Sequence, residues 1–337
     1  MNATYKVSKR LREIYHSLFL DRDFLNELRH KLRILVVETT NVCNADCVFC
    51  GYRYQSRPRQ VINGELFRRT VDEFARLGGR EICLSGVVGD PLTDPGIVEK
   101  ARYCAGRETF RRIGMFTNCL NLHQIGAEGL LTSGLTEITV STTGFDEEMY
   151  RRLFRNPGFA SMRSNLVALV RLNEALGRPV KIRIALRIDR PPGEVLADSG
   201  FAEVAGLADV VGANHYYDSW SGRIRGEELP GNMRLRPGWL SPFRGRRPCA
   251  ELYGGISVLS NGTITACGCR DLDGDSRLAL GNMEDSSLEE AYFSQRLDTI
   301  RDNWLRKGEV PEICRDCGQY HSAGYLKLRE VARRFLP

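Results

Sequence analysis

Three cysteines in one short segment are the residues whose chemistry the sequence states most clearly. They stand in the run Cys43-Asn-Ala-Asp-Cys47-Val-Phe-Cys50, which directly follows the apolar stretch at 34–37. A cube of four irons and four sulfides takes four ligands, and cysteine is the usual one. Three local thiolates therefore leave one iron open, and an open position at a catalytic metal binds a substrate or cofactor. A zinc knuckle is the alternative interpretation of the run.

A second group of cysteines occupies the last quarter of the chain. One thiol precedes a predicted hairpin, one follows it, and a C-x2-C pair comes about 50 residues later: Cys249, Cys267, Cys314 and Cys317. Without a secretory signal, such spacing favours metal chemistry over disulfides. The four thiolates can close an iron–sulfur cluster suited to electron transfer, and a four-cysteine zinc site fits the same spacing. The isolated Cys83, Cys104 and Cys119 are predicted core thiols.

One thiol of the last quarter, Cys269, lies two residues after Cys267 and exceeds the count of four ligands. Three interpretations are open for it: a substitute ligand, an inert thiol, or a hydrogen-atom donor. The donor role is chemically reasonable because an S–H bond is weak enough to quench a carbon radical. We therefore take Cys269 as the candidate catalytic residue.

Composition limits the class of protein. The 337 residues are 42% hydrophobic, which excludes disordered and fibrous chains and allows a sizeable core. The net charge is 48 − 42 = +6, without a dense basic run, so nucleic acid is not a favoured partner. No apolar run is long enough for a membrane helix, and the N-terminus lacks an apolar signal region. We expect a cytoplasmic protein that has no membrane partner.

Short β-branched runs alternate with longer amphipathic stretches along most of the chain, which is typical of βα units and a parallel sheet. Helices are predicted over 64–78 and 123–132, and strands over 33–38, 81–85, 112–117, 136–142, 180–188 and 209–216. The predicted fold class is α/β, with a partial (β/α)6 barrel. Its site should lie at the carboxyl ends of the strands, where the first cysteines are.

The alternation stops near residue 216, and this change sets the predicted domain boundaries. A hairpin is expected from Ile256 to Ala266, with the turn Ser260-Asn261-Gly262. We predict a helical arm at 1–31, the barrel at 32–217, an irregular connector at 218–248 and a small hairpin-helix auxiliary-cluster domain at 249–337.

The first cysteine run matches C-x3-C-x-aromatic-C, with Phe49 as the aromatic residue. In this it resembles the radical S-adenosylmethionine (SAM) superfamily, and the resemblance covers residues 32 to 216. It implies that SAM chelates the open iron and is cleaved to a 5′-deoxyadenosyl radical, which abstracts hydrogen from an unactivated carbon. The hard chemistry then belongs to the cofactor and the protein supplies positioning.

Other segments resemble the superfamily's SAM contacts. The run at 85–92 is similar to its G-G-E-P motif, with Gly89 followed by Asp90 in place of glutamate, and implies a hold on the methionine amino group. Asn118 and Ser141 end strands whose counterparts face the SAM ribose or carboxylate. In the strand at 180–188, alternation points Arg187 into the barrel, where it can pair with a carboxylate of SAM or substrate. A solvated edge-strand face is the alternative.

The last quarter resembles the superfamily's twitch domain, a shortened SPASM domain. Gly262-Thr-Ile-Thr-Ala-Cys267 reproduces its G-x4-C, and no cysteine for a further cluster follows Cys317. The resemblance implies one auxiliary [4Fe-4S] cluster beside the SAM-binding one. Similar enzymes oxidise a secondary alcohol of an aminocyclitol or epimerise a carbon of a sugar or aminoglycoside. The spare Cys269 favours epimerisation, with oxidation as the alternative, and either needs an electron donor such as flavodoxin or ferredoxin.

Two further expectations concern the substrate. Peptide-modifying relatives commonly carry a leader-recognition domain, whereas only residues 1–31 precede the first predicted strand, so a small molecule is favoured. A non-catalytic metal-binding protein is the remaining alternative. The loop at 214–220 is polar and aromatic, which suits stacking and hydrogen bonding to a sugar, and its candidate contacts are His215, Tyr217, Asp218 and Trp220. A packed interdomain linker is the other interpretation of this loop.

Overall fold

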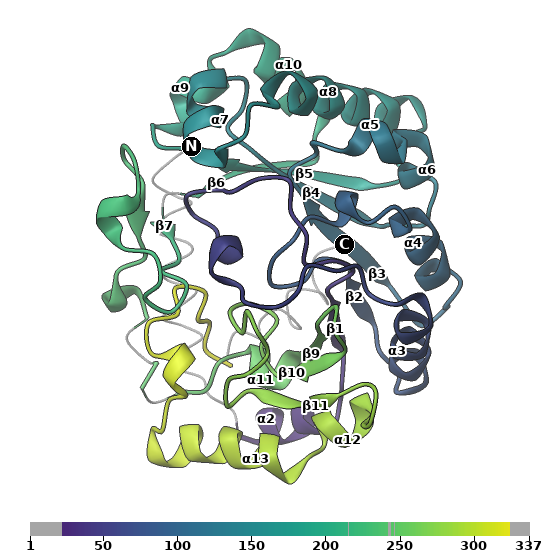
Figure 1. Ribbon diagram of the computed structural model, residues 1–337, viewed down its shortest axis with the longest axis vertical. Coiled ribbons are helices and arrows are strands. Elements are labelled where there is room, and N and C mark those ends of the chain that lie inside the picture. The colour runs from purple at the N-terminus through teal and green to yellow at the C-terminus, as the bar shows by residue number, and fades with distance from the viewer. Residues whose placement is uncertain (1–21, 215, 242–243, 246, 324–337) are drawn as a thin grey trace.

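The computed structural model describes residues 22–214, 216–241, 244–245 and 247–323. Its centre is a curved sheet in which six parallel strands lie side by side in sequence order, β1 to β6 (Figure 1). These strands are β1 (Ile34–Val37), β2 (Glu81–Cys83), β3 (Arg112–Thr117), β4 (Glu137–Thr142), β5 (Lys181–Arg187) and β6 (Val210–Asn214). The α/β class and the six predicted strands are confirmed.

Helices cover the outer side of these strands (Figure 1). They are α3 (Gly64–Arg76), α4 (Ile97–Ala105), α5 (Leu122–Ile125), α6 (Ala127–Leu131), α7 (Glu147–Phe154), α8 (Phe159–Ala175), α9 (Pro192–Leu196) and α10 (Ser199–Leu207). Helix α3 begins where the Asn63 side chain accepts from two backbone amides, and it buries Phe67, Val71 and Phe74. The single helix predicted over 123–132 is wrong, because Gly126 adopts a positive φ of 91° that divides it into α5 and α6.

Strand β5 shows how the barrel separates its two faces. Its apolar side chains, Ile182, Ile184 and Leu186, are buried under the helices, whereas Arg183 and Arg187 on the other face are half-buried. This confirms the predicted inward direction of the arginines. The alternation places charged and polar groups in the interior of the barrel, where a ligand can reach them.

The C-terminal region adds three strands to the same sheet. The predicted hairpin forms β9 (Gly255–Val258) and β10 (Thr263–Thr265), which pair antiparallel, and β11 (Ala279–Asn282) follows. Strand β9 also pairs in parallel with β1, so the sheet runs β11-β10-β9-β1 and on to β6. The turn needs glycine at position 262, where φ is 85°. One sheet therefore includes strands from both sides of the predicted domain boundary at residue 249.

The remaining elements are short and frame the sheet. Helix α2 (Arg22–Arg29) packs beside α11 (Glu251–Gly254), and α12 (Leu288–Tyr292), α13 (Gln295–Asp302) and the π-helix η5 (Asn303–Lys307) follow β11. The connector carries the two-stranded sheet of β7 (Tyr216–Tyr217) and β8 (Arg234–Leu235) with η3 (Gly226–Glu228) and η4 (Gly238–Leu240). Three more 3-10 turns are η1 (Gly51–Tyr54), η2 (Pro91–Thr93) and η6 (Glu312–Cys314).

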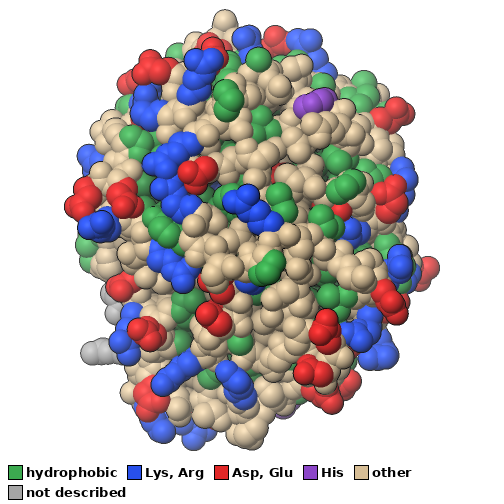
Figure 2. Space-filling model, in the orientation of Figure 1, with side chains coloured by type: hydrophobic (Ala, Val, Ile, Leu, Met, Phe, Trp, Pro, Cys, Tyr) green, Lys and Arg blue, Asp and Glu red, His purple; other side chains and the backbone are tan. Residues whose placement is uncertain are grey.

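The distribution of charged side chains and the lengths of the apolar helices agree with the modest net charge and ordinary hydrophobic content of the sequence. Basic and acidic side chains are intermixed over the face shown in Figure 2. Within the part of the chain that the structure describes, no helix combines the length and the apolar character needed to cross a membrane. The core lies between the sheet and its helices, and β1 contributes the fully buried Leu35 and Val37.

Candidate functional site

The loop that carries Cys43, Cys47 and Cys50 begins just beyond the carboxyl end of β1. Its backbone is held by the end of α7, because Val48 N donates to Leu153 O at 2.9 Å. Within the loop, Cys50 N donates to Cys47 O at 3.1 Å. These contacts fix the path of the loop and bring its thiols together at the predicted edge of the sheet.

The three thiols of this first cysteine cluster are half-buried and electrostatically coupled. Burial raises the pKa of Cys47, and the neighbouring Cys50 and Cys43 raise it further. Burial also raises the pKa of Cys43, as do Asp90 and Cys50. Thiolates crowded in this way repel one another and lack solvent, and iron coordination offsets both effects. The donor set therefore fits an iron–sulfur cluster with three protein ligands.

The Gly89-Asp90 segment packs directly against the start of this loop. A Cβ at Gly89 would lie 2.3 Å from Thr40 O, and its φ is 95°, so only glycine fits. The Asp90 carboxylate is 3% exposed and accepts from Leu92 N at 3.0 Å, Thr117 Oγ1 at 2.9 Å and Asn118 N at 2.6 Å. Burial raises its pKa. A direct contact of Asp90 with SAM stays a prediction. The structure shows that Asp90, in the loop after β2, is hydrogen-bonded to the end of β3.

Asn118 links the end of β3 to the cysteine loop. Its Nδ2 donates to Asn44 Oδ1 at 2.7 Å and approaches Cys43 Sγ at 3.9 Å. Ser141 is half-buried near the end of β4. The structure thus brings Asn118 to the first cysteine cluster, and the predicted roles of both residues toward SAM stay predictions.

Arg187 lies at the end of β5 beside the aromatic residue of the cysteine motif. Its guanidinium is 5.7 Å from the centre of the Phe49 ring. Burial lowers the pKa of Arg187, the thiolates of Cys47 and Cys50 oppose that effect, and among the described residues its buried Nε has no hydrogen-bond partner. A buried guanidinium with an unused donor suits an anionic ligand such as a carboxylate. That ligand is not identified by the structure, so the SAM contact of Arg187 stays a prediction.

The four predicted auxiliary thiols are also mutual neighbours. Burial raises the pKa of Cys314, and Cys267, Cys249 and Cys317 each raise it further. Burial likewise raises the pKa of Cys317 to about 11. Three of these thiols are buried and Cys249 is half-buried, and four thiols that oppose one another's ionisation fit the corners of a second cluster. Among the described residues, no three His, Cys, Asp or Glu side chains surround a single metal-ion position; a cube spreads its ligands over four corners instead.

Cys269 is paired with one of these ligands. A hydrogen bond between the two side chains lowers the pKa of Cys267 and raises that of Cys269. Cys269 itself is half-buried. Of the three isolated cysteines, Cys104 and Cys119 are buried as predicted. Cys83 is instead half-buried, because its strand end carries it toward the barrel interior.

The predicted sugar contacts are occupied by protein partners, and His215 lies outside the described residues. Tyr217 is buried and its hydroxyl accepts from Ile188 N at 3.1 Å. Asp218 and Trp220 are 4% and 8% exposed. The arrangement is that of a packed segment, and a substrate contact by these residues stays a prediction.

Two residues that the sequence did not single out belong to the site. Phe116, on the inward face of β3, is 50% exposed although it lies in a central strand. Arg270 lies beside Cys50 and partly opposes the rise that burial causes in the pKa of that thiol. The sequence offered one signal for each residue. Arg270 directly follows Cys269, and Phe116 is an aromatic residue two positions before Asn118.

Charged residues close the other end of the barrel interior. Arg112 pairs with Glu137 at 3.1 Å and with Glu81 at 3.4 Å, and Arg183 Nε lies 2.8 Å from Glu137 Oε1. These residues lie near the amino ends of their strands, opposite the cysteine loop. The inner face of the barrel therefore carries this ion-pair network near one end of its strands and the first cysteine cluster at the other.

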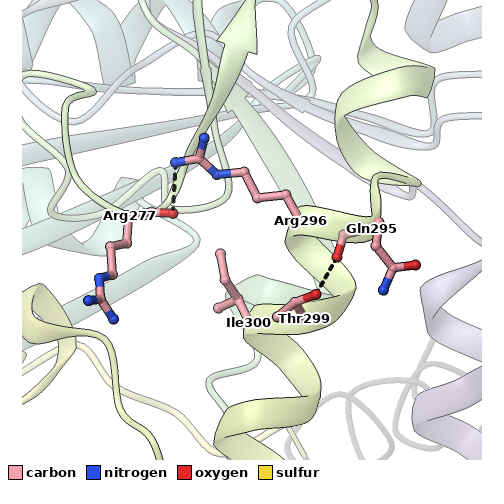
Figure 3. Close-up of a pocket in the computed structure, with 5 residues that line it drawn as sticks. All are labelled: Arg277, Gln295, Arg296, Thr299 and Ile300. Atoms are coloured by element: carbon pink, nitrogen blue, oxygen red, sulfur yellow. Dashed lines mark hydrogen bonds between the residues drawn. The ribbon is translucent and has the colours of Figure 1, made fainter.

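A separate hollow lies on the C-terminal region and contains none of these groups. Its lining is shown in Figure 3: Arg277 and four residues of α13, of which Arg296 reaches toward Arg277. Arg296 Nη2 donates to Arg277 O at 3.5 Å across one side of it. It does not contribute to the site.

Two family models match the chain in the order of its two cysteine clusters. The radical SAM superfamily matches residues 37–186, and SPASM, an iron–sulfur cluster-binding domain, matches residues 249–318. The chain thus carries a radical SAM domain followed by a SPASM domain. Such domains bind SAM with a [4Fe-4S] cluster and, in the SPASM part, an auxiliary iron–sulfur cluster, which agrees with the two sets of coupled thiols.

Curated relatives resemble a part of this radical SAM protein. A GTP 3′,8-cyclase of Pseudomonas putida (strain GB-1) is 31% identical over 144 residues, which is 42% of each chain. An AdoMet-dependent heme synthase of Methanosarcina barkeri (strain Fusaro / DSM 804) is 32% identical over 127 residues, 37% of this chain and 35% of that protein. The match thus spans less than half the length of these relatives.

Solved structures extend the likeness over both domains. Streptococcus suis SuiB bound to its precursor peptide SuiA superposes with a TM-score of 0.60 at 15% identity, covering 82% of this chain and 68% of SuiB. BtrN in complex with AdoMet and 2-DOIA gives 0.53 at 12% identity, covering 85% and 92%. At these identities the likeness concerns the fold.

Proposed function

We propose that this radical SAM enzyme epimerises a carbon of a sugar or aminoglycoside-type small molecule, with Cys269 as the hydrogen-atom donor. The observation that supports the donor role is the thiol count and placement. Four thiols of the C-terminal domain face one another, and the fifth, Cys269, pairs with Cys267 beside Arg270. Arg270 in turn reaches toward Cys50, so the spare thiol lies on the side of the first cysteine cluster.

SAM, bound at the first cluster, supplies a carbon radical that removes a hydrogen atom from the substrate. Cys269 then transfers its S–H hydrogen atom to the opposite face of the substrate radical, which gives the inverted product and a sulfur radical. One electron and one proton restore the thiol. The electron would come from an external reductant such as flavodoxin or ferredoxin, and the proton from solvent.

The barrel interior supports a small polar substrate. The Phe116 ring is half exposed on the inner face of the barrel, which also carries charged and polar groups. An aromatic face packs against the C–H face of a sugar ring while polar neighbours bind its hydroxyls. Arg187, with its unused Nε, can hold an anionic group of SAM or of the substrate. Phe49, Gly89, Asp90, Asn118 and Ser141 are the proposed positions around SAM.

Oxidation of a secondary alcohol is the second candidate. It is favoured by the four-thiol auxiliary site, because a cluster with all four corners ligated by protein accepts an electron and does not bind substrate. In that reaction the Cys249, Cys267, Cys314 and Cys317 thiols would hold the cluster that serves as acceptor for the second electron of the substrate radical, and a base would take the hydroxyl proton, so that the product would be a ketone. BtrN, whose fold is similar, is described with AdoMet and 2-DOIA.

The deciding experiment supplies candidate aminoglycosides and glycosides to the anaerobically reconstituted enzyme with SAM and a reductant in D2O. We expect deoxyadenosine and one deuterium at an inverted carbon, since thiol protons exchange with solvent. Cys269→Ala should form deoxyadenosine without inverted product, and Cys104→Ala, at a fully buried core thiol, should act as wild type. Normal inverted product from Cys269→Ala would exclude the donor role, and a ketone from wild type would establish oxidation.

A further inference from the structure

Residues 218–221 form a bridge between the two cysteine clusters. On one side, Trp220 Nε1 donates to Phe49 O at 2.9 Å, next to Cys50. A Cβ built at Gly51 would lie 2.3 Å from the Trp220 ring. The indole therefore occupies the space that the missing side chain of Gly51 leaves, and it holds the first cysteine loop directly.

The other side of this bridge is attached to the C-x2-C segment of the auxiliary cluster. Ser219 Oγ donates to Asp316 O at 3.0 Å, and Ser221 Oγ donates to Ile313 O at 2.9 Å. A Cβ at Gly318 would lie 2.8 Å from Asp218 Oδ2, so that carboxylate packs against the backbone directly after Cys317. Both cysteine segments thus contact the bridge at 218–221, the first through Trp220 and the second through its other three residues.

The backbone of the bridge is shaped for these contacts. Trp220 and Ser221 have positive φ angles of 51° and 59°, a region that few non-glycine residues adopt. Two consecutive residues in this conformation turn the chain sharply, so that the indole faces the first cluster while the hydroxyls face the second. Such strain persists only where the surrounding contacts determine the conformation.

Arg270 completes the bridge with a charge. Its guanidinium carbon is 4.0 Å from the centre of the Trp220 ring, and its Nε is 2.8 Å from Asp218 Oδ1. Burial raises the pKa of Cys50 in the first cluster and of Cys317 in the second, and Arg270 opposes that rise at both thiols. Arg187, by comparison, lies beside Cys47 and Cys50.

We propose that Arg270, held between Asp218 and Trp220, is a positioning residue shared by both clusters and that the Arg270–Asp218 pair sets their reduction potentials. A cluster gains negative charge when it is reduced, so a nearby cation stabilises the reduced form and raises its potential. Asp218 offsets part of that effect. This role is independent of the substrate and of the Cys269 donor step.

The test is a reduction-potential titration of the reconstituted enzyme followed by electron paramagnetic resonance. The SAM-binding cluster is distinguished by the change of its signal when SAM is added. Arg270→Met should lower the potentials of both clusters, and Arg270→Lys should restore most of the loss. Asp218→Asn, which keeps the shape of the side chain, should raise them. The opposite directions distinguish a charge effect from general loosening of the fold.

Two further arginines serve as controls. Arg187→Met should lower the potential of the SAM-binding cluster and leave the auxiliary cluster unchanged. Arg171→Met, at an exposed pair with Glu203 on the outer surface, should change neither. If Arg270→Met lost iron, Asp218→Asn would decide the question by itself. Unchanged potentials in Asp218→Asn, or equal downward shifts in Arg270→Met and Asp218→Asn, would overturn the proposal.

Discussion

The substitution Glu38→Gln tests a buried ion pair that joins the barrel to the C-terminal region. Glu38 follows β1, is fully buried and binds Arg57 through two parallel contacts of 2.6 and 3.0 Å. Ser260, in the turn of the β9–β10 hairpin, donates to Glu38 Oε1 through its N at 3.1 Å and its Oγ at 2.9 Å. Arg57 Nε also donates to Leu272 O at 2.8 Å. One carboxylate thus connects three segments.

The expected loss is large because the amide removes the negative charge and leaves the Arg57 cation buried. Breaking a buried pair by neutralising one partner costs about 3–5 kcal/mol. Each kcal/mol lowers Tm by about 2–4 °C for 150–250 residues, and the value falls with length. At about 2 °C per kcal/mol, Glu38→Gln should therefore lower Tm by roughly 6–10 °C.

The assay is thermal unfolding of the anaerobically reconstituted protein, followed by circular dichroism at one scan rate. Asp72→Asn is the matched control, because it breaks an exposed pair with Arg107 at 2.6 Å, and such pairs contribute about 0.2–1 kcal/mol. The double variant Glu38→Gln/Arg57→Met removes the stranded cation and should melt above Glu38→Gln. Equal melting temperatures for Glu38→Gln and Asp72→Asn would refute the reasoning.

Three further predictions concern other parts of the molecule. Gly51→Ala should lower stability by about 1–3 kcal/mol, because its Cβ would overlap the Trp220 ring, while Gly212→Ala, with nothing within 4 Å, should not; thermal melts compare them. Asp302→Asn should melt below wild type at pH 6, and the gap should close as pH falls through 4 to 3. Its carboxyl pKa is lowered by the hydrogen bond from Arg29, so its stabilisation is present above the unfolded pKa and is lost on protonation. Replacing the three cysteines of the first cluster by Ala should reduce iron from about eight to about four per chain and abolish deoxyadenosine formation, whereas full iron retention would contradict the assignment.

The elements that the sequence predicted well are those whose pattern is local. The strand over 112–117 is found with the same bounds, and the helix predicted over 64–78 is found as α3, which buries Phe67, Val71 and Phe74 at positions i, i+4 and i+7. The hairpin turn followed from Asn-Gly chemistry, which acts over a few residues. The split at Gly126 was missed because glycine permits both a helical and a positive-φ conformation, and the surrounding packing decides between them.

The site divides in the same way. The sequence by itself determined which residues can ligate iron, because cysteine type and spacing are local properties of a loop and of a C-x2-C pair. Only the tertiary structure decided that residues 218–221 lie between the two clusters, that Arg270 reaches Cys50, and that Glu38 meets Arg57 and Ser260. These contacts join residues tens to hundreds of positions apart. They depend on how β9 docks beside β1 and on how the connector packs, and neither leaves a periodic signal in the chain.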